Sequence, residues 1–231
     1  MNHPIYAFYG HHKCATMSLK TLCGSVCRRL GRSFNSVYNE DQFNRDLVSY
    51  CQKKNIEFLA YVNADSQYIN DLNPHKGFHI IRDPRDIVVS AYYSHGYSHP
   101  TLNWPELEQH RKKLNKMSLN EGLIEEIYFR KRSFEHIYNW NYDNDQILEI
   151  RFEDLVKNNY KTILRIFEFL DLLDQDDYKF IKRFAGLGRE IRASIKARTN
   201  ILIPRIVANN KIPSAELLTI AWRNRFEAKS K

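Results

Sequence analysis

The sequence FHIIRDPRDIVVS, residues 78–90, decides the fold class because a strand, a polar turn and a helix start follow one another within it. The apolar run 78–81 is typical of a short buried strand. Asp83 is a favourable helix N-cap, and Pro84 suits the first helical position, where its missing N–H costs nothing. The stretch therefore places the cation of Arg82 between a strand and a helix, with the Ser90 hydroxyl two turns further on.

An earlier stretch, IYAFYGHHKCATMSL at residues 5–19, has the same organisation. The run 5–9 is predicted to be a strand that Gly10 ends, and apolar residues at helical spacing predict a helix from Thr16 to Leu30. The start of a helix offers backbone N–H groups to an anion, and Lys13 adds a positive charge beside them. The stretch is not a Walker A loop, because the glycine and lysine order of that motif is absent.

Strands and helices are predicted to alternate along the rest of the chain. Further strands are predicted at residues 33–38, 56–62 and 146–152, and further helices at 41–54, 118–140, 153–170, 174–184 and 214–226. Alternation of this kind is typical of a parallel sheet with helices on both faces. We therefore predict an α/β three-layer sandwich with a mostly parallel sheet, like that of P-loop nucleoside triphosphatases, in a single domain of residues 1–231. Ligands of such folds bind at the carboxyl ends of the strands, where both quoted turns lie.

The charge of the chain favours an anionic partner. The formal net charge is +8 and the pI is about 9.2, which suits a polyphosphorylated nucleotide, a nucleic acid or a membrane surface and does not choose among them. The densest basic runs, residues 111–113 and 130–132, are interpreted as solvated helix faces.

The four cysteines predict no disulfide framework and no metal site, because none of them forms a CxxC pair. Cys14 lies in the polar loop of the first stretch and is a candidate reactive thiol. No signal peptide and no apolar run of about 18 residues is visible in the sequence. We therefore expect a soluble protein without a transmembrane segment, located in the cytoplasm.

Taken together, the two quoted stretches resemble the cofactor-binding motifs of the sulfotransferases that use 3′-phosphoadenosine 5′-phosphosulfate (PAPS). Residues 5–19 resemble the family's 5′-phosphosulfate loop, in which a lysine is commonly followed by Ser or Thr, then Gly and Thr. Residues 78–90 resemble its 3′-phosphate motif, matching at Arg82, Pro84, Arg85, Asp86 and Ser90. The sequence ILEIRFEDL, residues 147–155, is similar to a third family segment, and the resemblance covers roughly residues 4–170 in the same order and spacing.

The resemblance implies a role for each matched position. Lys13 would contact the phosphosulfate and its bridging oxygen, and Arg82 and Ser90 would bind the 3′-phosphate. The 5′-phosphate would be bound by backbone groups and the Thr16 hydroxyl within the loop, which comprises His12, Lys13, Cys14, Ala15, Thr16, Met17 and Ser18. Phe152 would border the adenine. Arg192, Lys196 or Arg198 would supply the late positive charge that an Arg-Lys-Gly element carries in some family members, although none of the three is aligned with it. The reaction would transfer the sulfuryl group from PAPS, leave adenosine 3′,5′-bisphosphate (PAP), and require no metal.

The chain departs from the family pattern at two places. Cys14 and Ala15 stand where a small hydroxyl residue and glycine are usual, and Met17 and Ser18 replace a Thr-Trp pair or similar, so Ser18 cannot stack on adenine. A histidine after the middle strand, or a glutamate after the first helix, serves as general base in family members. Here Asp65 follows the middle strand, and Glu40 and Asp41 stand at the place of the glutamate. With His95, they leave four candidate bases open.

Two other functions are compatible with the sequence. A basic nucleic-acid-binding module without catalysis would explain the charge and the aromatic content, although no recognised nucleic-acid motif is present and we expect no such partner. A metabolite kinase with an atypical phosphate loop would depend on Mg²⁺ and ATP. The acceptor is expected to be a small molecule or a carbohydrate with a hydroxyl or amine group, and the sequence leaves its identity and the oligomeric state open.

Overall fold

Five parallel strands form one sheet, and the two quoted turns follow two of its strands. They are β1 (Ile5–Tyr9), β2 (Phe34–Val37), β3 (Phe58–Tyr61), β4 (His75–Ile81) and β5 (Ile147–Arg151), in the spatial order β2-β3-β1-β4-β5. Every neighbouring pair is parallel, so all five strands end at the same edge of the sheet. Both quoted turns follow central strands, β1 and β4, which are themselves paired.

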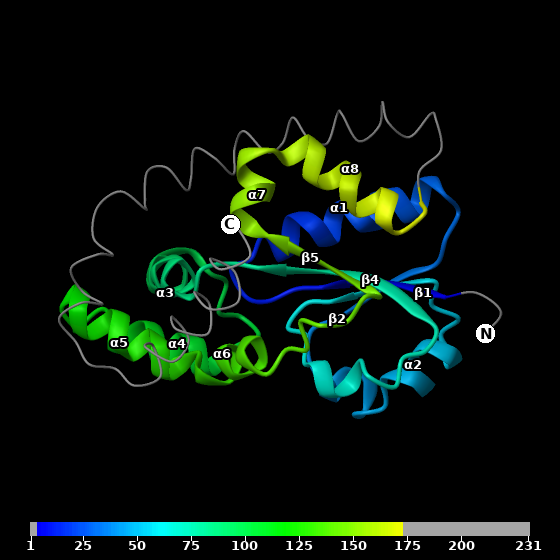
Figure 1. Cartoon of the computed structure of the whole chain (residues 1–231). Helices are drawn as coiled ribbons and strands as arrows, with labels where there is room; N and C mark the ends of the chain where they lie inside the picture. Colours follow the sequence, from blue (N-terminus) through cyan, green and yellow to red (C-terminus); the bar gives the residue numbers. More distant parts are fainter. Residues whose placement is uncertain (1–3, 173–231) are drawn as a thin grey trace. The chain divides into compact units, whose positions relative to one another are not determined.

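The computed structural model describes residues 4–172, which fall into two units (Figure 1). The first unit comprises residues 4–82 and 139–172 and contains the sheet; the second comprises residues 83–138 and is helical. The single domain predicted from the sequence stays a prediction. The helices predicted at 174–184 and 214–226, and the candidate ligands Arg192 and Arg198, lie outside the described residues.

Helices cover both faces of the sheet in the first unit. In Figure 1, α1 (Thr16–Arg29), α7 (Phe152–Lys157) and α8 (Asn159–Phe169) lie on one face, and α2 (Leu47–Lys53) lies on the other. Two short 3₁₀ turns, η1 (Glu40–Phe43) and η2 (Ser66–Tyr68), follow β2 and β3. The predicted α/β architecture with a parallel central sheet is confirmed.

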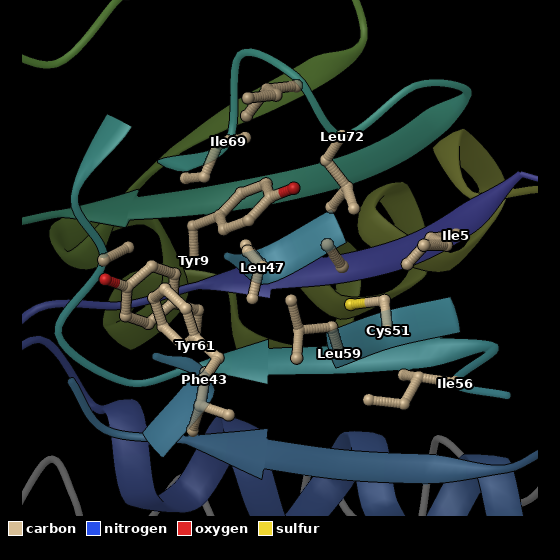
Figure 2. Packing of buried hydrophobic residues seen from close by; sticks show 14 of the residues in the cluster. Ile5, Tyr9, Phe43, Leu47, Cys51, Ile56, Leu59, Tyr61, Ile69 and Leu72 are labelled. Carbon is tan, nitrogen blue, oxygen red and sulfur yellow. The ribbon is translucent and has the colours of Figure 1, made fainter. Parts of the chain in front are cut away.

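The alternation of side chains along the strands builds a separate core on each face. On the α2 face, Tyr9, Leu59 and Tyr61 pack with Leu47 and Cys51 of α2 (Figure 2). A fully buried leucine such as Leu59 contributes about 1.5–3 kcal/mol to folding through the hydrophobic effect. On the opposite face the rings of Phe8 and Phe78, from β1 and β4, stack with centroids 4.8 Å apart, so the two central strands are held together on both sides.

The second unit consists of α3 (Pro84–Tyr93), α4 (Pro105–Leu114), α5 (Leu119–Phe129) and α6 (Lys131–Tyr138), with a π-helical turn at Ser94–Ser98. The predicted cap of α3 is confirmed, since the Asp83 carboxylate accepts a hydrogen bond of 2.9 Å from the backbone N–H of Arg85. The N–H of Ser118 donates to Glu121 and the Ser118 hydroxyl accepts from the Glu121 N–H, which forms a capping box at the start of α5.

Three helices predicted as continuous are interrupted, and the prediction of their length was wrong. The helix predicted at 118–140 breaks at Arg130, which ends α5 before α6 begins. In the segment 41–54, left-handed Asn44 and Arg45 separate η1 from α2. In the segment 153–170, Asn158 has a non-helical conformation between α7 and α8. Because the apolar spacing continues across these breaks, the sequence pattern does not reveal them.

None of the helices within residues 4–172 is long and apolar enough to cross a membrane. The cytoplasmic location stays a prediction.

Candidate anion-binding site

The loop between β1 and α1 folds tightly back on the start of its own helix. A side chain at Gly10 would approach Thr16 Cγ2 to 2.7 Å, so this position has no room for one. The carbonyl of His11 accepts hydrogen bonds from the Thr16 hydroxyl at 2.5 Å and from the Cys14 N–H at 3.2 Å. Lys13 and Ala15 have φ angles of 67° and 57°, in the left-handed region that non-glycine residues rarely adopt.

The start of α1 meets the requirements of an anion site. Its N-cap residue is Ala15, and this end of the helix has neither a side-chain cap nor an acidic residue in the first turn. The first intrahelical hydrogen bond runs from the Leu19 N–H to the Ala15 carbonyl, at 3.0 Å. The N–H groups of residues 16–18 therefore have no helical acceptor and can serve an anion.

Arg82 joins this loop to two other parts of the first unit. It directly follows β4, is only 5% exposed, and donates from Nη1 to the carbonyl oxygen of Lys13 at 3.0 Å. Its guanidinium lies over the Phe152 ring, 4.3 Å from the ring centroid. The Asp83 carboxylate pairs instead with Arg85, whose Nε lies 2.9 Å away. The structure thus brings together Lys13, Arg82 and Phe152, which lie far apart in the sequence.

Cys14 corrects one prediction. The side chain is fully buried, and burial raises the pKa of its thiol to about 12, although the positive charges of Arg82 and Lys13 act in the opposite direction. The thiolate, which is the reactive form, is therefore scarce at neutral pH. The prediction of a reactive thiol at this position was wrong, and only the backbone of Cys14 is suited to binding.

The remaining predicted cofactor ligands have different degrees of exposure. His12 is half-buried, while Met17, at 56% exposure, and Ser18 lie on the exposed side of α1. Ser90 is half-buried in α3 and belongs to the second unit.

The charges of two of the four candidate bases raise the pKa of the same tyrosine. Burial raises the pKa of the Tyr61 hydroxyl at the end of β3, and the charges of Asp65 and then Glu40 raise it further. Asp65 caps η2 and accepts from the Gln67 backbone N–H at 3.1 Å and from the Gln67 amide at 2.7 Å. Glu40 is buried at the start of η1, whereas Asp41 beside it is exposed. The sequence analysis did not single out Tyr61, whose only sequence signal is its place at the end of a predicted strand.

His95 lies within the second unit and is fully buried. Its Nδ1 is 2.8 Å from one oxygen of the Glu126 carboxylate, and the other oxygen is 2.8 Å from Nε2 of His110. Burial lowers the pKa of His95, although its hydrogen bond to Glu126 acts in the opposite direction. The structure argues against His95 as the general base, because none of its side chain reaches solvent.

The same three residues have the donor types of a divalent cation site. Their ligand atoms, from His95, His110 and Glu126, all lie within 4.8 Å of one another. Both oxygens of the carboxylate are already hydrogen-bonded to an imidazole, and the charge of Glu126 raises the pKa of the half-buried Arg130, against the effect of burial. The three side chains therefore form a hydrogen-bonded cluster in which each imidazole pairs with one oxygen of the carboxylate.

The comparisons agree with this fold. Residues 72–181 match the family model described as the sulfotransferase domain, a segment that contains Arg82, Ser90 and Phe152 and begins after the loop of Lys13. The structure is similar to that of the mouse sulfotransferase SULT7A1 complexed with PAP, with a TM-score of 0.53, 12% identity, and coverage of 96% of this chain and 84% of that one. A sulfotransferase from Alicyclobacillus acidocaldarius matches with a TM-score of 0.42 and 15% identity, over 86% of this chain and 97% of that one. No curated protein matches the chain.

A five-stranded parallel sheet with a cationic turn after β1 and after β4 gives the chain an α/β fold similar to that of the mouse sulfotransferase. The similarity to the sulfotransferase domain therefore covers residues 72–181, a segment of slightly less than half of the chain.

Proposed function

We propose that the protein transfers the sulfuryl group of PAPS to a hydroxyl or amine of a small-molecule or carbohydrate acceptor. The observation that carries this proposal is the hydrogen bond from Arg82 to the carbonyl of Lys13, which joins the two motifs that resemble the family's cofactor-binding segments. The mouse protein of similar fold was crystallised with PAP, the product that this reaction would leave.

The loop residues bind the 5′ end of the cofactor in this proposal. The N–H groups at the start of α1 and the hydroxyl of Thr16 contact the 5′-phosphate. Lys13 stabilises the negative charge that develops on the leaving phosphate oxygen as the S–O bond breaks. His12 flanks this group, and Met17 and Ser18 contribute through their backbone.

Arg82 and Ser90 bind the 3′-phosphate. A guanidinium binds a phosphate through two parallel N–H donors, and Arg82 keeps part of its fork for this purpose because only Nη1 is engaged by the loop carbonyl. Nε of Arg82 is buried and has no hydrogen-bond partner within residues 4–172. Phe152, which supports the guanidinium, borders the adenine. Arg192 and Arg198 remain candidates for a further positive charge.

A carboxylate near the ends of β2 and β3 removes the proton from the acceptor. Glu40 and Asp65 are the first two candidates, and both oxygens of Asp65 accept hydrogen bonds from Gln67. Asp41 is the third candidate and is exposed. The acceptor oxygen then attacks sulfur in line with the leaving oxygen, and positioning with charge stabilisation supplies most of the rate.

The experiment that tests this function is a turnover assay with PAPS over a panel of phenols, amines and sugars, with PAP release as the readout. We expect PAP release that depends on an acceptor and that is lost in Lys13→Ala. Phosphoryl transfer from ATP that requires Mg²⁺ would instead identify a kinase. Binding to random oligonucleotides that falls steeply with salt, without any turnover, would identify a nucleic-acid-binding module.

A further inference from the structure

A buried polar cluster lies behind the anion-binding loop in the first unit and has no role in the function proposed so far. It consists of His11, His79, Trp140 and Glu149, and we call it the His79 cluster. The strand register pairs Tyr9 of β1 with His79 of β4, and His79 with Glu149 of β5. Because parallel partners direct their side chains to the same face, these positions meet at the edge of the sheet where the loop begins.

The hydrogen bonds of the cluster are well defined. His79 is fully buried, its Nδ1 is 2.7 Å from one oxygen of Glu149, and the Trp140 indole N–H donates to the other oxygen at 3.0 Å. Burial holds the pKa of His79 well below its usual value, so the ring is neutral. A carboxylate only accepts hydrogen bonds, so the single N–H of the neutral ring is at Nδ1. The ring also stacks on Trp140, with centroids 3.9 Å apart and planes inclined by 22°.

His11 connects this cluster to the loop. Its ring is buried and stands on edge against both members of the stack, 4.8 Å from the His79 centroid and 5.8 Å from that of Trp140. The carbonyl of the same residue accepts the hydrogen bonds from the Thr16 hydroxyl and the Cys14 N–H. The ring of His11 is therefore fixed by the cluster while its backbone fixes the loop.

The loop needs such an anchor because its conformation is strained. Lys13 and Ala15 both adopt left-handed backbone angles without being glycine. Residues in such conformations persist only where the surrounding structure holds them, at a cost of about 1–3 kcal/mol each. At Gly10 the loop backbone is bonded to Tyr61 and Ala64 beside it. Beyond Gly10, the described contacts of the loop backbone are Arg82 on the Lys13 carbonyl, the Cys14 thiol on the His12 carbonyl, and the bonds that centre on His11.

We propose that His79 and Glu149 are positioning residues, which hold His11 and through it the loop from Gly10 to Thr16 in the conformation that binds the cofactor. This role rests on the proposed function, because the loop is the candidate 5′-phosphosulfate site. His79 and Glu149 act through His11 and do not themselves touch the cofactor.

The test compares His79→Leu with His75→Leu in the full chain. His75 is a matched control: it is also a buried histidine of β4, on the same face, and its Nδ1 bonds to the Leu72 carbonyl at the other end of the strand. Two readouts are used, PAP affinity by calorimetry and hydrogen exchange of the amides of residues 10–16. His79→Asn, which restores a donor toward Glu149, is the conservative variant.

We expect His79→Leu to weaken PAP binding at least about tenfold and to speed exchange of the loop amides, since misplacement by about 1 Å can cost 10²-fold. His75→Leu should leave both readouts at the wild-type level even where it lowers the melting temperature, and His79→Asn should recover part of the affinity. If the wild-type chain and the His79→Leu variant bind PAP equally well, the positioning role of His79 is overturned and the proposed function stands. A folded wild-type chain that binds no PAP would overturn the proposed function and, with it, this role.

Discussion

Ala15 provides a quantitative test of the loop conformation. It stands where the sulfotransferase motif commonly has glycine, and its φ of 57° and ψ of 18° are left-handed. For a residue with a side chain this conformation costs about 1–2 kcal/mol. Glycine relieves that cost in the folded state but loses about 0.4–1 kcal/mol through the greater freedom of the unfolded chain. Ala15→Gly is therefore expected to stabilise the protein by about 0.5–1 kcal/mol.

Gly31 supplies the matched control, because its φ is +66° and a side chain there would meet nothing within 4 Å. Gly31→Ala should destabilise the protein by the same amount that Ala15→Gly stabilises it. For a chain of this size, 1 kcal/mol corresponds to about 2–4 °C in melting temperature. Scanning calorimetry of both variants should thus give shifts of about 1–4 °C in opposite directions. A lower melting temperature for Ala15→Gly, with Gly31→Ala behaving as expected, would refute the left-handed loop.

Three further predictions concern chemistry and pH. Lys13→Ala should lower kcat about 10²–10³-fold, measured by PAP release under saturating acceptor, because the variant loses the charge that stabilises the leaving oxygen. Turnover equal to that of wild type would remove the role assigned to Lys13. Burial lowers the pKa of His75, His79 and His95; each folded-state pKa is thus below the unfolded value, so stability should be full above pH about 6.5 and fall as the pH is lowered through the folded values. Urea unfolding at pH 7.5 and pH 5 measures this difference, and a chain more stable at pH 5 would contradict it. All four thiols are buried, so a thiol reagent at pH 8 should modify none rapidly in the native chain and four after unfolding; fast labelling of Cys14 would contradict its raised pKa.

The elements that the sequence predicted well are those with strong local signals. The buried runs at 5–9 and 78–81 became β1 and β4, and Asp83 with Pro84 opened α3 as capping preferences require. The breaks at Asn44, Arg130 and Asn158 were missed, because the apolar period passes through each of them. At each of these residues the backbone leaves the helical conformation, and the spacing of apolar side chains carries no information about backbone angles.

The contacts within the candidate site were only partly predictable from the sequence. The family resemblance placed Lys13 and Arg82 in one site, but the bond from Arg82 to the Lys13 carbonyl joins residues 69 positions apart and has no local signal. The left-handed conformation of Ala15 also has no local sequence signal, since alanine rarely adopts it. The His79 cluster does have a signal in the sequence, because His79 and Glu149 are polar residues that each interrupt an apolar strand. Two such interruptions on neighbouring strands indicate a pair of side chains in contact.

The central claim, that Arg82 helps to bind a PAPS-type nucleotide, is tested most directly by calorimetric titration of PAP into wild type, Arg82→Ala and Arg32→Ala. Arg32 is the control because its guanidinium, like that of Arg82, makes one polar contact and one ring contact: an ion pair with Glu57 at 3.2 Å and a contact with the Tyr6 ring at 5.1 Å. We predict micromolar binding by wild type and Arg32→Ala, and affinity at least about 30-fold weaker for Arg82→Ala, the equivalent of about 2 kcal/mol for a lost charged partner. No binding by folded wild type, or equal binding by Arg82→Ala, would contradict the claim.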